Sequence, residues 1–174
     1  DGTNDFVAYY STQLNAAFNR AECTINLFFK MRNAAAWTAA TQRTQFSIRA
    51  SGVDLFELKK TPTSGQMNFD FRLGGVAKGV TVNGLSSLDF LMYTFSWSKA
   101  ADRARAYINA VQQGTTQTGL GTWGVFNLSS GNCVFGCANT AASNPSNGFG
   151  GYLNIFNREL SPLEIAKIYD VSNY

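Results

Sequence analysis

The sequence has no histidine in 174 residues. Serine–histidine–aspartate and cysteine–histidine arrangements are therefore excluded, because in both an imidazole takes the proton from the nucleophile. Without histidine, Cys133 and Cys137 in "CVFGC" also make a poor zinc site.

Charged residues are scarce as well, at 14% against roughly 25% in an average soluble domain. The 14 basic and 11 acidic residues are dispersed, and the longest basic run is Lys59-Lys60, so no nucleic-acid-binding surface is indicated. Apolar runs stay far below the roughly 20 residues that span a bilayer, which argues against membrane insertion. An uncharged polar surface suits an extracellular, cell-surface or virion-surface protein. The missing initiator Met predicts a processed product or an excised domain.

There are only three cysteines, Cys23, Cys133 and Cys137, so at least one lacks an intramolecular partner. Two interpretations remain open. Cys133 and Cys137 can close a small disulfide loop, with Gly136 easing the turn, or all three are reduced and partly buried thiols.

The sequence is rich in segments where apolar and polar residues alternate with a period of two, which is typical of half-buried strands. The clearest are 23–31, 45–50 and 67–73, while 89–97 is apolar on both faces, like a central strand. Segment 104–114 predicts a hairpin with its bend at Asn109-Ala110. Many short strands with one helix predict an all-β fold: a two-sheet antiparallel sandwich or jelly roll, in one domain over residues 1–174.

The end of the chain changes to a helical pattern at about residues 161–170. Ser161 is a suitable N-cap, Pro162 suits the first helical position, and Glu164 completes a Ser-x-x-Glu capping box. Leu160 and Ile165 have the spacing of a hydrophobic staple. A helix this short is marginal alone, so we expect it to pack on the sandwich and hold the two sheets together.

The closing segment "FNRELSPLEIAKIYD" and the strand before it resemble the end of laminin-G-like domains of the concanavalin A-like lectin/glucanase superfamily. The matching residues are Gly151, Leu153, Ile155, Phe156, Asn157, Arg158, Leu160, Ser161, Glu164, Ile165 and Tyr169. The segments "DGTNDFV", "FLMYTFSWS" and "ARAYINAVQQGT" are similar to other strands of that family, so the resemblance spans residues 1–170. It implies a jelly roll, an architecture that hosts lectins, adhesion modules, hydrolases and passive spacers.

The resemblance also bears on catalysis and on metal binding. Glucanase members carry carboxylates two residues apart on one strand, so that both reach the same sugar bond. No two acidic residues here have that spacing, which favours a non-catalytic member over a glycoside hydrolase or lyase with its site assembled from distant segments. Asp1, Asn4 and Asp5 are calcium candidates, or they only shape a turn. Asn154 replaces an Asp of the family pattern, which weakens a calcium site inferred from the family.

Three loops combine aromatic rings with amide and hydroxyl side chains, the groups that meet the apolar faces and hydroxyls of sugars. Loop 33–44 carries Trp37, and loop 112–124 carries Trp123. Loop 137–151 carries Asn139, Asn144, Asn147 and Phe149. For each ring, the alternative is burial against the edge of the sandwich.

These features lead to two main hypotheses. The first is a binding module that recognises a glycan or surface polysaccharide through loops at one edge of the sandwich, within a larger surface or virion protein. The second is a structural subunit, such as a virion decoration, fibre or spike component, whose partners are other protein subunits.

Overall fold

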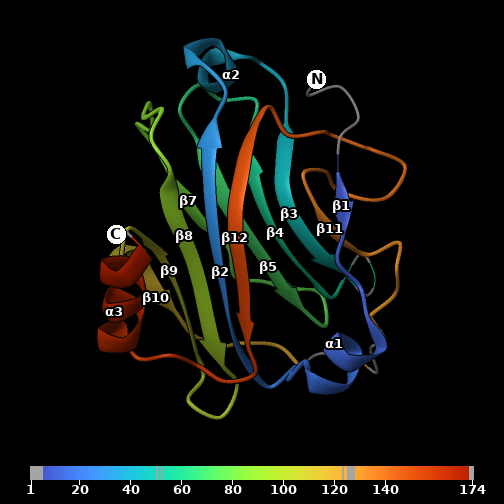
Figure 1. Ribbon diagram of the computed structural model, residues 1–174. Coiled ribbons are helices and arrows are strands. Elements are labelled where there is room, and N and C mark those ends of the chain that lie inside the picture. Colours follow the sequence, from blue (N-terminus) through green and yellow to red (C-terminus); the bar gives the residue numbers. More distant parts are fainter. Residues whose placement is uncertain (1–5, 50, 52, 123, 125–127, 173–174) are drawn as a thin grey trace.

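The computed structural model describes residues 6–49, 51, 53–122, 124 and 128–172, which form two antiparallel sheets packed face to face (Figure 1). The seven-stranded sheet has the order β1 (Val7–Ala8), β11 (Cys133–Phe135), β3 (Arg43–Arg49), β4 (Leu55–Lys60), β5 (Met67–Leu73) and β6 (Val76–Ala77), and β7 (Val80–Val82) also pairs with β5. The five-stranded sheet has the order β10 (Val111–Gln117), β9 (Arg103–Ile108), β8 (Leu91–Ser98), β2 (Glu22–Met31) and β12 (Gly148–Phe156). The described helices are α1 (Thr12–Ala17), α2 (Ala34–Thr38) and α3 (Pro162–Ser172). The expected two-sheet jelly roll is confirmed.

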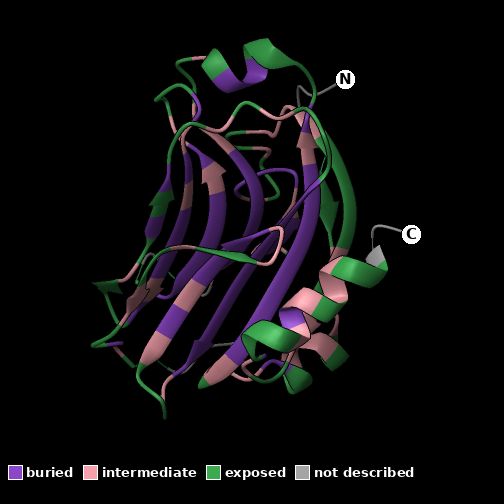
Figure 2. Ribbon diagram, turned by 90° about the vertical axis from the view of Figure 1, so that its left-hand side faces the viewer, coloured by how far each residue is buried: buried purple, intermediate pink, exposed green. Residues whose placement is uncertain are grey.

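The core lies between the two sheets and is built from the alternating residues that were predicted to face inward (Figure 2). From β2 it takes Cys23, Ile25, Leu27, Phe29 and Met31. From β5 it takes Met67, Phe69, Phe71 and Leu73. Aromatic rings join the layers: the centroids of Phe56 and Phe95, and those of Phe71 and Trp97, are 4.9 Å apart. The prediction that segment 89–97 is a central strand is confirmed from Leu91 onward, because β8 is buried along its whole length. Asp89 and Phe90 precede the strand and are exposed.

The hairpin between β9 and β10 bends at Asn109 and Ala110, as predicted. Both residues have positive φ, 49° and 63°, as both central residues of a type I′ turn do. The amide oxygen of Asn109 accepts a hydrogen bond from the backbone N–H of Met92 at 2.8 Å, which ties the turn to β8. Ala110 occupies a position where glycine would avoid strain.

Helix α3 begins with the predicted capping box. Ser161 Oγ accepts a hydrogen bond from the Glu164 backbone N–H at 3.3 Å, and Glu164 Oε2 accepts one from the Ser161 backbone N–H at 2.8 Å. Leu160 and Ile165 are buried in a cluster with Phe28, Met92 and Tyr107 of the five-stranded sheet. These sheet residues face away from the main core. The expectation that the helix holds the two sheets together is therefore wrong, because α3 covers the outer face of one sheet.

The cysteines are all unpaired and buried, so the interpretation in which Cys133 and Cys137 form a disulfide is wrong. The side chains of Cys133 and Cys137 lie in different environments. Cys133 faces the core from β11, and burial raises its thiol pKa to about 12. Cys137 follows the turn at Gly136, and its thiol donates to the Asn139 carbonyl at 2.8 Å. The interpretation as reduced thiols is the one that fits.

Candidate functional site

One lateral edge of the sandwich opens into a cleft of about 700 Å³ between β12 of one sheet and β1 and β11 of the other. The described residues that line it are Phe6, Val7, Tyr9, Arg32, Phe135, Gly136, Ser146, Asn147, Gly148, Phe149, Gly150, Gly151 and Leu153. The lining combines apolar rings with amide, hydroxyl and backbone groups. A volume of this size is in the range of small-molecule sites.

Glycines of β12 shape the wall of this cleft. A Cβ atom on Gly150 would lie 2.0 Å from Phe135 Cε1, and one on Gly148 would lie 2.2 Å from Phe29 Cζ. Carbon atoms in contact are normally about 3.5–4.0 Å apart. Both positions therefore need glycine, because the two rings lie directly against the β12 backbone.

A β-bulge displays Tyr152 beside the cleft. The pairing of β12 with β2 shifts register between Gly150 and Leu153, so that Gly151 and Tyr152 stand outside the regular ladder. Bulges of this kind redirect side chains. Tyr152 is 72% exposed, and its ring meets the buried Phe28 edge-on at a centroid distance of 6.3 Å. The bulge therefore holds an exposed ring on a buried one.

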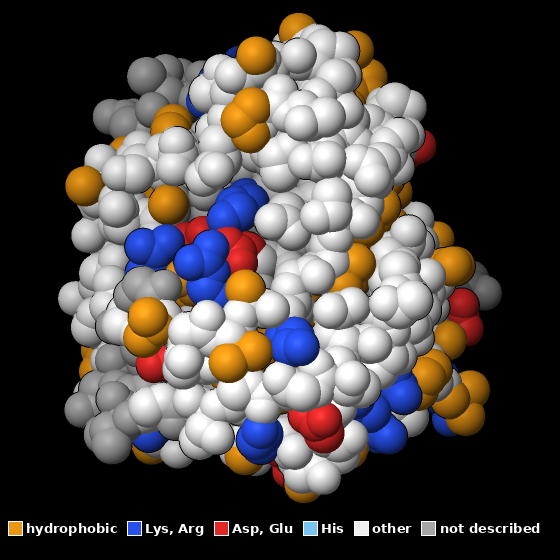
Figure 3. Space-filling model, turned by 180° about the vertical axis from the view of Figure 1, so that it is seen from behind, with side chains coloured by type: hydrophobic (Ala, Val, Ile, Leu, Met, Phe, Trp, Pro, Cys, Tyr) orange, Lys and Arg blue, Asp and Glu red, His pale blue; other side chains and the backbone are white. Residues whose placement is uncertain are grey.

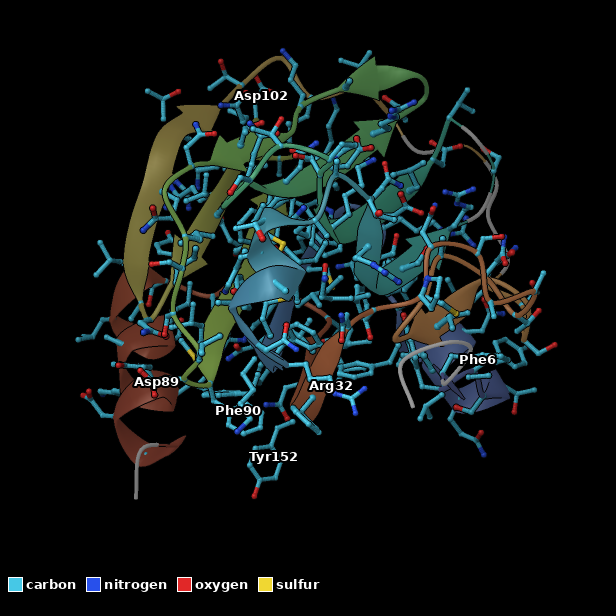
Figure 4. All side chains as sticks on the ribbon, turned by 90° about the horizontal axis from the view of Figure 1, so that it is seen from above. Phe6, Arg32, Asp89, Phe90, Asp102 and Tyr152 are labelled. Atoms are coloured by element: carbon cyan, nitrogen blue, oxygen red, sulfur yellow. The ribbon has the colours of Figure 1, made fainter. Side chains whose placement is uncertain are left out.

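The next row of side chains across the sheet places an ammonium group between two rings. Lys30 is opposite Phe149 of β12, and on its other side Phe90 immediately precedes β8. The Lys30 Nζ lies 4.9 Å from the Phe90 centroid and 5.4 Å from the Phe149 centroid, within cation–π range. We call Phe28, Lys30, Phe90, Phe149 and Tyr152 the β12 aromatic patch. Figure 4 shows Phe90 and Tyr152 on the same side of the molecule as Arg32.

Of the residues predicted to bind a ligand, Asn147 and Phe149 line the cleft. Asn139 and Asn144 lie in the preceding loop and do not line it. The Asn139 Oδ1 accepts hydrogen bonds from the backbone N–H groups of Ala141 and Ser143, so this amide shapes its own turn. Trp123 lies outside the described residues, and its role stays a prediction.

Trp37 is the predicted residue that the structure contradicts. It is 2% exposed in α2, and its indole N–H donates to the Ser87 carbonyl at 2.8 Å. The short helix turns Ala36 and Trp37 toward the core. The ring therefore closes one end of the sandwich and is unavailable to a ligand.

The described residues do not form a metal site. No group of three or more Cys, Asp and Glu side chains in that part of the chain could hold an ion. Asp1, Asn4 and Asp5 lie outside the described residues, so the calcium site stays a prediction. No described helix is long and apolar enough to cross a membrane.

Two carboxylates do meet on the outer face of the seven-stranded sheet, where Figure 3 shows basic and acidic side chains together. Glu57 and Asp70 are opposite each other in β4 and β5. Lys59 lies 2.5 Å from Asp70 and 3.6 Å from Glu57, while Arg49 pairs with Glu57 and Arg72 pairs with Asp70. Burial raises the Asp70 pKa, but the hydrogen bonds and charges of Lys59 and Arg72 together outweigh it and lower that pKa. A general acid needs the opposite shift, so this is an ion-pair network.

Sequence reasoning missed Lys30, Arg32, Phe90 and Tyr152. The Gly150-Gly151 pair before Tyr152 could have indicated a bulge. Phe28 and Lys30 alternate with the core residues of segment 23–31, so they fall on the other face of that strand. The sequence did not predict that β8 and β12 are the neighbours of this strand, because they come from distant parts of the chain.

Comparisons with known proteins match this architecture. A family model described as concanavalin A-like lectin/glucanases superfamily covers residues 1–166. No curated protein sequence matches the chain. The CBM40 of Ruminococcus gnavus IT-sialidase, solved with α2,3-sialyllactose, is similar with a TM-score of 0.67 and 13% identity, over 87% of this chain and 84% of that one.

Two larger proteins contain a similar domain. The receptor-binding domain of botulinum neurotoxin mosaic serotype C/D has a TM-score of 0.67 and 13% identity, over 92% of this chain and 38% of that one. The NanB sialidase of Streptococcus pneumoniae has a TM-score of 0.70 and 14% identity, over 94% of this chain and 26% of that one. This chain therefore spans well under half of either protein. At these identities the likeness shows the fold alone.

Proposed function

The chain belongs to the concanavalin A-like lectin/glucanase superfamily, and from this premise we propose that it is a non-catalytic module that binds carbohydrate at the cleft and the β12 aromatic patch. The observation that carries the proposal is the position of three exposed rings at this edge. Phe90, Phe149 and Tyr152 are 45%, 49% and 72% exposed. Rings held in this way can stack on the apolar faces of sugar rings.

The cleft beside the rings supplies the polar part of such a site. Asn147 and Ser146 offer an amide and a hydroxyl, and the glycines of β12 leave backbone groups accessible along the same wall. Sugar hydroxyls are recognised by polar groups of this kind, placed around an apolar surface. The similar CBM40 domain was solved with a bound sialyllactose, which supports a glycan ligand for this chain.

The non-catalytic part of the proposal rests on the carboxylates. Glu57 and Asp70, the cross-strand pair described above, form ion pairs with Arg49, Lys59 and Arg72. They lie on the seven-stranded sheet, whereas β12 belongs to the five-stranded sheet. The lowered Asp70 pKa favours the ionised form of that carboxyl group, so Asp70 is unsuited to donate a proton to a leaving group. We place the module on an extracellular, cell-surface or virion-surface protein, in keeping with its weakly charged composition.

Assembly through strand edges, the structural-subunit alternative, has less support at β10. Side-chain amides of this edge strand donate to its own carbonyls: Gln113 to Val111 at 3.0 Å, and Gln117 to Thr115 at 2.9 Å. The register of β10 against β9 also shifts between Gln113 and Gln117, and such an irregularity makes an edge a poorer template for an added strand. Sedimentation at high protein concentration tests this alternative, since an edge-paired subunit would self-associate.

A glycan array of the purified chain tests the proposed function, run with calcium and with a chelator because of Asp1, Asn4 and Asp5. For a bound glycan, calorimetric titration then compares Tyr152→Ala and Phe149→Ala with Leu163→Ala, a control on α3 whose exposed fraction, 66%, lies between those of the other two. We expect Tyr152→Ala and Phe149→Ala to bind about tenfold more weakly, because stacking is lost, and we expect the affinity of Leu163→Ala to equal that of the parent chain. An array with no bound glycan in either condition would refute the proposal.

A further inference from the structure

Two contacts join the opposite walls of the cleft. The Ser146 backbone N–H donates to the Gly136 carbonyl at 2.6 Å, and both residues line the cleft. The ring of Phe135, on the β11 side, lies directly against the β12 backbone at Gly150, and these two residues also line it. The first contact lies where the chain passes from β11 to β12, so the cleft is closed at the end where β12 begins.

Two residues of β12 line the cleft and also touch the aromatic patch. Phe149 lines the cleft, and the centroid of its ring is 5.4 Å from the Lys30 ammonium group. Gly151 lines the cleft as well, and a Cβ atom on it would lie 3.2 Å from Phe28 Cβ and 3.6 Å from Phe90 Cε1. Because Gly151 has no side chain, nothing projects from that position between the cleft and the patch. The two surfaces are therefore continuous across β12.

The exposed rings of the patch extend over more than one row of side chains. Phe90 and Phe149 both contact the ammonium group of Lys30. Tyr152 lies over Phe28, which is two positions before Lys30 on β2. Residues two apart on a strand are about 7 Å apart, so Tyr152 belongs to a neighbouring row. A pyranose ring is about as wide as the ring on which it stacks, so one sugar cannot stack on all three exposed rings.

Resting on the proposed function, we infer that the ligand is a linear oligosaccharide of several units rather than a single sugar. Its terminal unit binds in the cleft, and the next units cross β12 at Gly151 and stack on Phe90 and Tyr152. The cleft offers amide, hydroxyl and backbone groups to the first unit, whereas the open patch offers stacking to the others. A single sugar in the cleft would leave the exposed rings without a contact, so the affinity depends on chain length.

The test compares chains of different length by calorimetric titration. The probes are cello-oligosaccharides and chito-oligosaccharides of one to six units, sialyllactose with and without added N-acetyllactosamine units, and stepwise truncations of any other glycan that binds on the array. We expect the affinity to rise by about tenfold or more once the chain is long enough to reach the patch, because stacking is then added. Units beyond the patch should add nothing.

Variants separate the cleft from the patch. Tyr152→Ala and Phe90→Ala should each bind the long chains about tenfold more weakly and bind the short chains like the parent chain. Asn147→Ala, in the cleft, should weaken the binding of short and long chains by a similar factor, because the first unit loses a polar partner. Leu163→Ala, exposed on α3, should change neither affinity.

The outcomes distinguish this inference from the proposed function. Equal affinity for every length of a glycan that binds would overturn the oligosaccharide ligand and leave carbohydrate binding intact. No binding to any glycan would overturn both. A gain with length that survives Tyr152→Ala and Phe90→Ala together, in a double variant that melts like the parent chain, would overturn the role of the patch. An equal loss for short and long chains in Tyr152→Ala would contradict the order of the two surfaces.

Discussion

Gly150→Ala should destabilise the protein, because it places one methyl group where a ring already lies. The added Cβ would be 2.0 Å from Phe135 Cε1 and 2.1 Å from Phe135 Cζ. Contact between carbons requires about 3.5–4.0 Å, so the ring or the strand must move by about 1.5 Å. Gly150 does not have a positive φ, so alanine itself is not strained there. The predicted effect is therefore one of packing alone.

Overpacking of this kind typically costs about 1–3 kcal/mol in the free energy of unfolding. For a chain of this length each 1 kcal/mol lowers Tm by about 2–4 °C, which gives a decrease of about 2–12 °C in calorimetry. Phe135 is only half-buried and can partly move aside, which favours the lower half of the range. Gly131→Ala is the matched control. Its Cβ would lie 3.7 Å from Thr140 Oγ1, an ordinary contact, and its Tm should stay close to that of the parent chain.

A double-mutant cycle identifies the cause. In a Phe135→Ala background the ring is absent, so Gly150→Ala should then have little effect, and the two changes should couple by about 1 kcal/mol or more. If Gly150→Ala and Gly131→Ala melt at the same temperature, Phe135 does not lie against β12. An equal cost in both backgrounds would place the strain elsewhere. Either result would also contradict the packing of Phe135 against Gly150 in the wall of the cleft.

Three further changes test other parts of the fold. Ala110→Gly should raise the unfolding free energy by about 0.5–1 kcal/mol in urea titrations, because it relieves a φ of 63°, whereas the same change at Ala106, buried in β9, should lower it. Hydrogen bonds from Arg158 and from the helix cap lower the Glu164 pKa to about 2. The stabilisation that this gives is complete above the unfolded pKa of about 4.3 and is lost as pH falls through 2. The melting temperature of Glu164→Gln should therefore depend less on pH in this range than that of the parent chain. Thr24→Val removes the hydroxyl that accepts a buried backbone N–H at 2.9 Å and should cost about 1–3 kcal/mol by denaturant unfolding, with unchanged stability as the contrary result.

The fold was largely predictable because its determinants are local. Alternation in 23–31 and 67–73 assigns every second side chain to the core, whatever the neighbouring strand is. The capping box at Ser161 and the two-residue turn at Asn109-Ala110 are likewise specified within a few residues, and both are present. The helix position was misjudged, because an apolar stripe shows that a helix packs without showing which face it covers.

The candidate site was only partly predictable, for a related reason. Composition pointed to the loop that carries Asn147 and Phe149, and both line the cleft. Composition could not separate an exposed ring from a buried one, so Trp37 was included although its indole N–H is bonded inside the sandwich. Lys30 was overlooked, because a lone lysine in a strand usually marks only a solvated face.

From the sequence by itself came the division into strands, the two-sheet architecture, the capped helix and the lack of an imidazole for catalysis, all of which depend on residues near one another in the chain. Tertiary structure alone decided that β8, β2 and β12 lie side by side, which brings Phe90, Lys30 and Phe149 into one row although they are up to 119 positions apart (149 − 30). A period of two assigns a side chain to one face of a sheet, but the neighbours on that face depend on strand order, and strand order is set by long-range pairing.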